Sequence, residues 1–221
     1  MSEPFSTKDI VAISLALSEP RLGRYVVASH RNRRRALALY RWNAEASAAL
    51  FVPMSLCEVV LRNAIVEAIE HVYGPNWSAR GSAFERSLPR PKVGYSPFAD
   101  LESVRARYAH VGKLIPELKF MFWVSMLTSR YDRRVWTSLI KTVFPNLPAR
   151  MPALTARRLL HSQVNSIRIV RNRIAHHEPI FQRNLTADYR RCRSIVSWRS
   201  NETARWLDSM ERITHVTTEK P

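Results

Sequence analysis

Apolar residues recur every three to four positions along nearly all of this 221-residue chain. That spacing places them on one face of an α-helix, whereas a half-buried strand needs strict alternation of apolar and polar residues. We find no alternating run of useful length, and the chain has only five glycines for tight turns. The sequence therefore predicts an all-α protein built as a helical bundle.

Two long helices are expected at the centre of this bundle. Residues 36–73 are almost continuous helix formers, with Pro53 either kinking the helix or starting a new one. A second long helix is expected from about 155 to 177, because Pro179 disfavours helix at the residue before it. Both helices carry an apolar stripe, formed in the first by Leu50, Met54, Cys57, Leu61, Ile65, Ala68 and Val72, and in the second by Leu160, Val164, Ile167 and Ile174.

The rest of the pattern sets the expected domain organisation. Prolines and glycines gather between residues 75 and 98, which predicts one long Pro-rich loop. Shorter helices are expected over about 7–18, from about 20, and over about 100–112, 116–129, 132–143 and 186–214. We therefore expect an N-terminal helical appendage at 1–35, a helical domain at 36–216 and a frayed tail at 217–221.

The charge balance indicates a polyanionic partner. The chain has 35 Lys and Arg residues against 18 Asp and Glu residues, a formal net charge of +17. Its hydrophobic content of 46% is that of a folded domain and not of a basic tail. All but six of the cations are arginines, the residue type best suited to bidentate contacts with phosphate.

Composition also excludes several classes of protein. The glycines do not fall into the spacing of a phosphate-binding loop, and Cys57 and Cys192 are too few for a zinc finger or a disulfide framework. The first residues lack the basic region of a signal peptide, and the longest apolar runs are far shorter than a bilayer span. We expect a cytoplasmic protein with no membrane partner.

One carboxylate lies within the apolar circumference of the first long helix. Glu58 falls between Leu61 and Ile69 on the helical wheel, where a carboxylate is costly unless it is paired. Arg62, one turn further on, is the nearest candidate partner. The alternative interpretation is an ordinary Glu–Arg pair on a partly exposed helix surface.

The second long helix carries an arginine inside its apolar stripe. Arg171 either extends to solvent from there or meets an anion. Asn172 and His176 are four residues apart, so the amide can orient the imidazole. Arg171 and His176 are roughly 140° apart around an ideal helix, so one helix does not easily aim both at one phosphate. Two copies related by a two-fold axis can bring them together, which predicts a homodimeric site.

Four motifs in a fixed order make the chain recognisable. They are Tyr40-Arg41-Trp42-Asn43, the segment Glu58 to Asn63, the turn Gly74 to Trp77, and the segment Arg171 to Phe181. In these motifs the chain resembles the Abi-like family of bacterial abortive phage infection proteins. Arg171 to His176 also fits the arginine–polar–three residues–histidine signature of the HEPN superfamily of helical ribonucleases. The matches span about residues 40 to 185.

The resemblance implies a HEPN-like bundle and a metal-independent endoribonuclease that uses no cofactor. His176 is then the general acid or base, Arg171 stabilises charge on the phosphate, Asn172 orients the pair, and Glu58 positions an arginine. His177 is the alternative histidine, because its distance from Arg171 fits a looser form of the signature. The family context implies an effector of phage defence or of a toxin–antitoxin system, and it allows an antitoxin as a second partner. The alternative function is a catalytically silent helical module that binds RNA or protein.

RNA contacts are expected from basic residues on the helices of the domain. The candidates are Arg31, Arg33, Arg34, Arg35, Arg62, Arg168 and Arg173. The alternative interpretation is that these arginines belong to solvated helix faces. No metal site is predicted, because neighbouring histidines such as His176 and His177 point about 100° apart on a helix.

Overall fold

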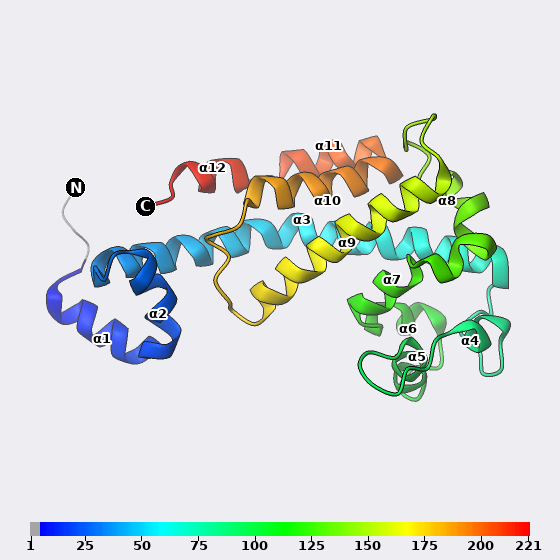
Figure 1. Ribbon diagram of the computed structural model, residues 1–221, viewed down its shortest axis with the longest axis horizontal. Coiled ribbons are helices and arrows are strands. Elements are labelled where there is room, and N and C mark those ends of the chain that lie inside the picture. Colours follow the sequence, from blue (N-terminus) through cyan, green and yellow to red (C-terminus); the bar gives the residue numbers. More distant parts are fainter. Residues whose placement is uncertain (1–4) are drawn as a thin grey trace.

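The computed structural model describes residues 5–221, whose regular elements are all helices, with no β-strand among them (Figure 1). This confirms the predicted all-α class. The helices are α1 (Thr7–Leu17), α2 (Glu19–Ala28), α3 (Arg33–Tyr73), α4 (Ala83–Ser87), α5 (Pro97–Arg105), α6 (Val111–Glu117), α7 (Phe120–Met126), α8 (Thr137–Val143), α9 (Ala153–Ala175), α10 (Leu185–Arg199), α11 (Asn201–Ser209) and α12 (Ile213–Thr218). Between α7 and α8, the chain forms a 3₁₀ turn, Ser129–Tyr131, and a π-helical turn, Asp132–Trp136.

Helix α3 is the axis on which the other elements pack. It has 41 residues, so it is about 60 Å long at the usual rise per residue. The Asn32 side chain caps its start by accepting a hydrogen bond from the Arg35 N–H at 3.0 Å. The helix ends at Gly74, which adopts a φ of 78° that suits glycine. Pro53 lies inside the continuous helix, so it starts no second one.

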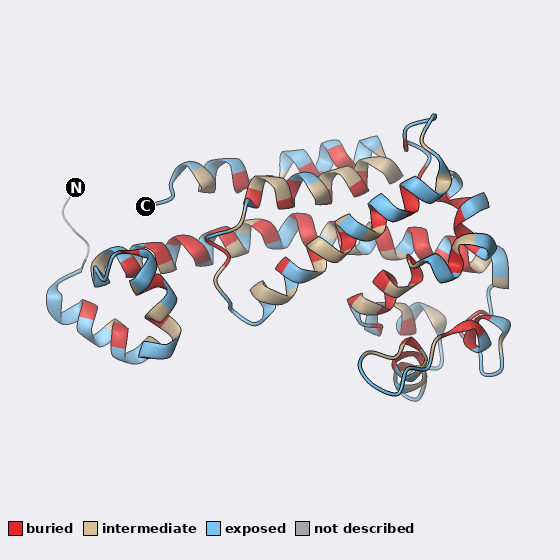
Figure 2. Cartoon of the chain, in the orientation of Figure 1, coloured by how far each residue is buried: buried red, intermediate tan, exposed pale blue. Residues whose placement is uncertain are grey.

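The second expected central helix, α9, lies across α3, and α10 covers α3 beside it (Figure 1). Buried residues line the faces that these helices turn to one another (Figure 2). Leu61 and Ile65 of α3 and Val164 and Ile167 of α9 are all at most 1% exposed. Because burial of each such side chain stabilises a fold by about 1.5–3 kcal/mol, this contact fixes the two helices against each other.

The N-terminal helices pack on the start of α3. Tyr25 of α2 lies between two rings, with its centroid 5.0 Å from that of Tyr40 and 5.1 Å from that of Phe181. Tyr25 is 1% exposed, so α2 belongs to the main core. The expected boundary after residue 35 falls inside the first turn of α3, which begins at Arg33.

The segment between α3 and α5 differs from the single long loop expected for it. It contains the short helix α4, which the Ser82 side chain caps by accepting from the Glu85 N–H. Trp77 and Phe84 are fully buried, with ring centroids 5.1 Å apart in an edge-to-face contact. These aromatic residues anchor the Pro-rich segment to the core.

The C-terminal part is three helices rather than the one expected over 186–214. Ser200 is extended (φ −154°, ψ 122°), and its hydroxyl caps α11 by accepting from the Thr203 N–H. Helix α12 continues to Thr218, so it includes the first two residues of the tail expected to fray. Beyond it, the Lys220 ammonium donates to the Phe181 carbonyl at 2.7 Å.

By length and composition alone, α3 could cross a membrane. A central helix of a bundle passes the same test. Here α3 buries one side against α9 and α10, and 39% of its most apolar 18-residue stretch is buried.

Candidate functional site

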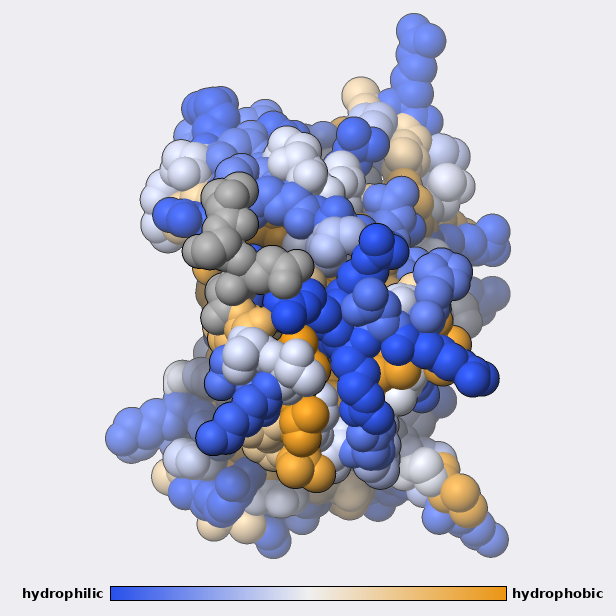
Figure 3. Space-filling model, turned by 90° about the vertical axis from the view of Figure 1, so that its left-hand side faces the viewer, coloured by the Kyte–Doolittle hydropathy of each residue, from blue (hydrophilic) through white to orange (hydrophobic). Residues whose placement is uncertain are grey.

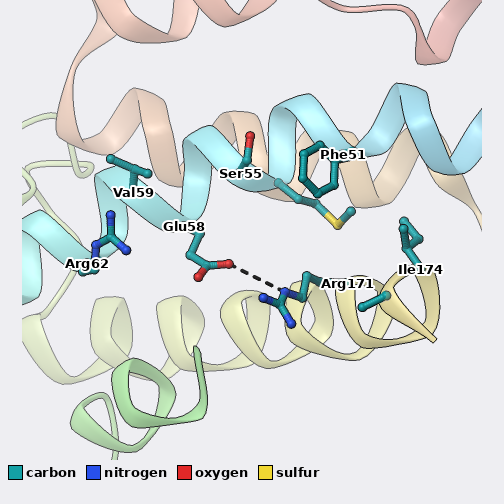
Figure 4. Close-up of a pocket in the computed structure, with 9 residues that line it drawn as sticks. Phe51, Ser55, Glu58, Val59, Arg62, Arg171 and Ile174 are labelled. Carbon is teal, nitrogen blue, oxygen red and sulfur yellow. Dashed lines mark ion pairs between the residues drawn. The ribbon is translucent and has the colours of Figure 1, made fainter. Parts of the chain in front are cut away.

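Glu58 and Arg171 face each other across the groove between α3 and α9 (Figure 4). The Arg171 Nε lies 3.8 Å from a carboxylate oxygen of Glu58, and the two side chains are 45% and 23% exposed. Both line a hollow of about 300 Å³ whose walls include Met54, Val59 and Ile174. We call it the Arg171 hollow. The pair leaves part of the guanidinium open to solvent, where an anion can reach its donors.

The partner of Glu58 is therefore Arg171 and not Arg62, the nearest candidate in sequence. The packing of α9 against α3 places Arg171 beside Glu58, and the periodicity of a single helix cannot predict such a contact between two helices. Arg62 lines the same hollow, and its Nε is buried without a hydrogen-bond acceptor among the described residues.

Helix α9 ends immediately before the two histidines. Its last helical residue is Ala175, and the His176 N–H donates to the Asn172 carbonyl at 2.9 Å. This backbone bond is the one hydrogen bond that joins the two residues in residues 5–221, so the expected amide–imidazole bond is not formed. His176 is exposed, and Arg171 lies in the groove. His176 follows the last helical residue of α9, so the angle expected for an ideal helix does not apply to it.

His177 occupies an unusual backbone position. Its φ is 55°, in the left-handed region, at the position after the helix cap where glycine is the common choice. The His177 N–H donates to the Ile174 carbonyl, and the Glu178 N–H donates to the Arg173 carbonyl. These two bonds complete a Schellman motif. The Arg21 guanidinium further fixes the turn by donating to the His177 carbonyl at 2.8 Å.

A second hollow adjoins the first and lies between α2, α3 and the end of α9. It measures about 270 Å³ and is lined by Tyr25, Tyr40, Asn43, Ala44, Ser47, Ala48, Phe51, Ile174 and His177. We call it the Tyr40 hollow. It shares the lining residues Phe51 and Ile174 with the Arg171 hollow, so the two hollows are neighbours along the groove. Of the two histidines, it is His177 that lines this groove.

Two of the residues that line the Tyr40 hollow, Asn43 and Tyr25, are buried. The Asn43 Oδ1 accepts a 2.7 Å hydrogen bond from the Ile180 N–H, which ties the segment after the histidines to α3. Burial, and then the neighbouring Tyr40, raise the pKa of Tyr25 to about 12, so its phenol stays neutral. Both Tyr40 and Asn43 belong to a motif that carried the resemblance, but their place beside the histidines was not predicted.

Several of the arginines expected to bind RNA have partners within the chain. Arg33 forms a 2.7 Å ion pair with Glu19, Arg173 lies 3.5 Å from Glu178, and the Arg168 Nε donates to Asn165 at 3.0 Å. The residues that are exposed at the start of α3 are Arg31, Arg33 and Arg35, while Arg34 is half-buried.

The end of the molecule that carries α1, α2 and the start of α3 is mostly hydrophilic (Figure 3). Both interpretations of these arginines therefore stay open. Three arginines that the sequence analysis did not select, Arg130, Arg133 and Arg134, line a polar hollow of about 600 Å³ near the start of α9.

No group of three or more His, Cys, Asp or Glu side chains in residues 5–221 is arranged to hold a metal ion. Cys57 and Cys192 are free and buried; the pKa of the Cys57 thiol is raised by its hydrogen bond with Cys192 and by burial. Both cysteines are therefore core residues and not nucleophiles.

Comparisons with protein-family models, with curated proteins and with solved structures gave no match to this chain. The family resemblance consequently rests on the four motifs alone, and the functional argument rests on the geometry of the groove.

Proposed function

We propose that this protein is a metal-independent endoribonuclease with a HEPN-like fold, whose site combines Arg171 and a histidine of two chains in a homodimer. The observation that carries the proposal is the Glu58–Arg171 pair in the groove between the two long helices. A carboxylate at 3.8 Å orients the guanidinium while leaving donors free for a phosphate. The net charge of +17 favours RNA as the substrate.

The dimer is supported by an exposed apolar strip on α3. Phe51, Val52 and Val59 are 62%, 39% and 40% exposed, and Phe51 and Val59 line the Arg171 hollow. Contiguous exposed apolar residues indicate an interaction surface. We propose that two such strips pair about a two-fold axis, with Arg171 of one chain near the histidines of the other.

The proposed reaction is transesterification followed by release of the downstream RNA. The 2′-oxygen attacks the neighbouring phosphorus, the bond from phosphorus to the 5′-oxygen breaks, and a 2′,3′-cyclic phosphate is left on the upstream fragment. His176 takes the proton of the 2′-hydroxyl or gives one to the leaving 5′-oxygen. Arg171 binds the oxygens on which negative charge grows in the transition state. His177 is the alternative proton carrier, since it lines the groove.

The cellular role rests on the resemblance. We assign the protein to the cytoplasm as an effector of phage defence or of a toxin–antitoxin system, in which an antitoxin would be the second partner. The alternative, a silent module that binds RNA in the same groove, makes the same contacts without moving protons.

The test is cleavage of a single-stranded RNA in the presence of EDTA, with analysis of the fragment ends. We expect cyclic or 3′-phosphate ends, and a rate lowered by about 10²–10⁴ in His176→Ala. Arg171→Lys should recover little activity, because an ammonium lacks the planar fork of donors. His71→Ala, an exposed histidine of α3 outside both hollows, is the matched control. RNA binding without cleavage would favour the silent module.

A further inference from the structure

We propose that the Tyr40 hollow holds a nucleobase of the RNA strand whose phosphate lies at Arg171, so that the site selects a base a few nucleotides from the bond it cleaves. The inference rests on the proposed function for the position of that phosphate. It is carried by Tyr40, Asn43 and Ser47, none of which takes part in the proposed chemistry.

The shape of the hollow comes from small residues on one face of α3. Tyr40, Ala44, Ser47, Ala48 and Phe51 follow one another at helical spacing and all line it. The two alanines are exposed, and their methyl groups leave open space between the larger side chains. From Tyr40 to Phe51 the helix rises about 16 Å, a length that accommodates one nucleotide with its base and sugar.

An aromatic ring at one end offers a stacking surface. Tyr40 is half-buried, and its ring is supported from α2 by the fully buried Tyr25 at 5.0 Å. A ring held on one side and open on the other loses little freedom when a base stacks on it. Stacking of single-stranded bases on aromatic side chains is a common mode of RNA recognition.

A buried amide supplies hydrogen-bond donors to the same space. Asn43 is 6% exposed, and its Oδ1 is occupied by the Ile180 N–H. Because the Ile180 N–H is a donor, the amide atom that it meets is the oxygen Oδ1, and this assigns the Nδ2 group to the other position. In the described chain the Asn43 Nδ2 donates no hydrogen bond, so two N–H donors are available at a residue that lines the hollow.

A hydroxyl one turn further on supplies an acceptor. The Ser47 hydroxyl donates to the Asn43 carbonyl at 2.7 Å, which leaves its oxygen lone pairs free. The donors of Asn43 and the acceptor of Ser47 are thus neighbours on one helix face. The edge of a nucleobase carries acceptors and donors side by side and matches this arrangement.

The position of the hollow relates the base to the cleaved bond. Phe51 and Ile174 line both hollows, but Tyr40 and Glu58 are 18 residues apart on α3, about 27 Å along its axis, so a base beside Tyr40 belongs to a nucleotide a few positions along the strand from the phosphate at Arg171. His177 also lines the Tyr40 hollow.

The test fills the hollow without removing any of its polar contacts. Ala44→Leu adds bulk at an exposed helix position, and Ala38→Leu makes the same change at an exposed α3 residue that does not line the hollow. Two measurements are made on each full-length variant. One is binding of short single-stranded RNAs that carry each of the four bases, or no base, at one position; the other is their cleavage.

We expect the wild type and Ala38→Leu to prefer one base over the abasic RNA by roughly 10-fold or more in affinity, as stacking contributes in other proteins. Ala44→Leu should bind all five RNAs alike. Equal binding of the abasic RNA by the wild type, or a base preference unchanged in Ala44→Leu, would overturn the inference. Base-dependent binding with no cleavage of any RNA supports the hollow and refutes the ribonuclease, so the two failures are distinguishable.

Discussion

The left-handed backbone of His177 allows the energetic cost of that conformation to be measured separately from the loss of the imidazole. At this position the φ of 55° places a side-chain-bearing residue in the left-handed region, inside a complete Schellman motif. His177→Gly and His177→Ala both remove the imidazole, but only the glycine variant removes the Cβ that makes this conformation unfavourable. The difference between the two variants therefore reports the strain at this position, less the greater freedom of glycine in the unfolded chain, and not the loss of the ring.

The expected magnitude follows from the conformation. A residue with a Cβ in the left-handed region lowers the free energy of unfolding by about 1–2 kcal/mol. Glycine avoids this cost, but its greater freedom in the unfolded chain lowers the free energy of unfolding by about 0.5–1 kcal/mol. We therefore expect His177→Gly to be the more stable variant by about 1 kcal/mol. In a chain of this length that corresponds to about 2–4 °C in Tm.

Urea unfolding and thermal melts of the two variants, measured side by side, test this expectation. Equal stability of His177→Gly and His177→Ala would refute the argument. The same pair answers a functional question, because both lack the imidazole. If His176 is the proton carrier, both variants should cleave RNA within a few-fold of the wild type.

Three further perturbations have defined outcomes. Glu58→Gln should keep the fold but release the guanidinium that it orients, lowering RNA cleavage by about tenfold or more with unchanged melting, as judged by kinetics and circular dichroism. If the start of α3 contacts RNA, Arg35→Ala should reduce the slope of log affinity against log salt concentration by about one phosphate contact. Arg33→Ala should reduce that slope by less, because Arg33 is already paired with Glu19. Slopes that equal the wild-type slope in both variants would show that neither arginine contacts RNA. The Arg193 guanidinium lowers the pKa of Asp208 below its usual 3.8, so this carboxylate stabilises the fold above pH 3.8 and the contribution disappears as the pH falls through the lowered pKa. Melts of Asp208→Asn should therefore lie below the wild type at pH 7 and converge with it in acid; a constant gap would contradict the assignment.

Helical periodicity predicted the parts of the fold that depend on long apolar stripes. The two central helices and their contact through Leu61, Ile65, Val164 and Ile167 were predicted in this way, because these residues repeat over several turns. Breaks that depend on a single polar cap were missed. The break at Ser200 is an example, since a serine in a polar run gives no strong stop signal.

In the candidate site too, features set by one helix were predicted, and features set by the packing of several helices were not. The inward position of Arg171 followed from its place in the stripe, but its pairing with Glu58 depends on how two helices dock. The helical wheel of α3 alone suggested Arg62 as the partner of Glu58. Likewise, Asn43 and His177 line one groove although they are far apart in sequence, and only the packing of α2, α3 and α9 brings them together. The catalytic roles themselves stay predictions.

The central claim is that Arg171 of one chain acts with His176 of the other, and subunit mixing tests it most directly. Arg171→Ala and His176→Ala proteins are each inactive under this account. After equal amounts are mixed and allowed to exchange subunits, half of the dimers are mixed and each mixed dimer regains one intact site. RNA cleavage should then return to about a quarter of the wild-type rate. No recovery in a mixture shown to contain mixed dimers would contradict the account.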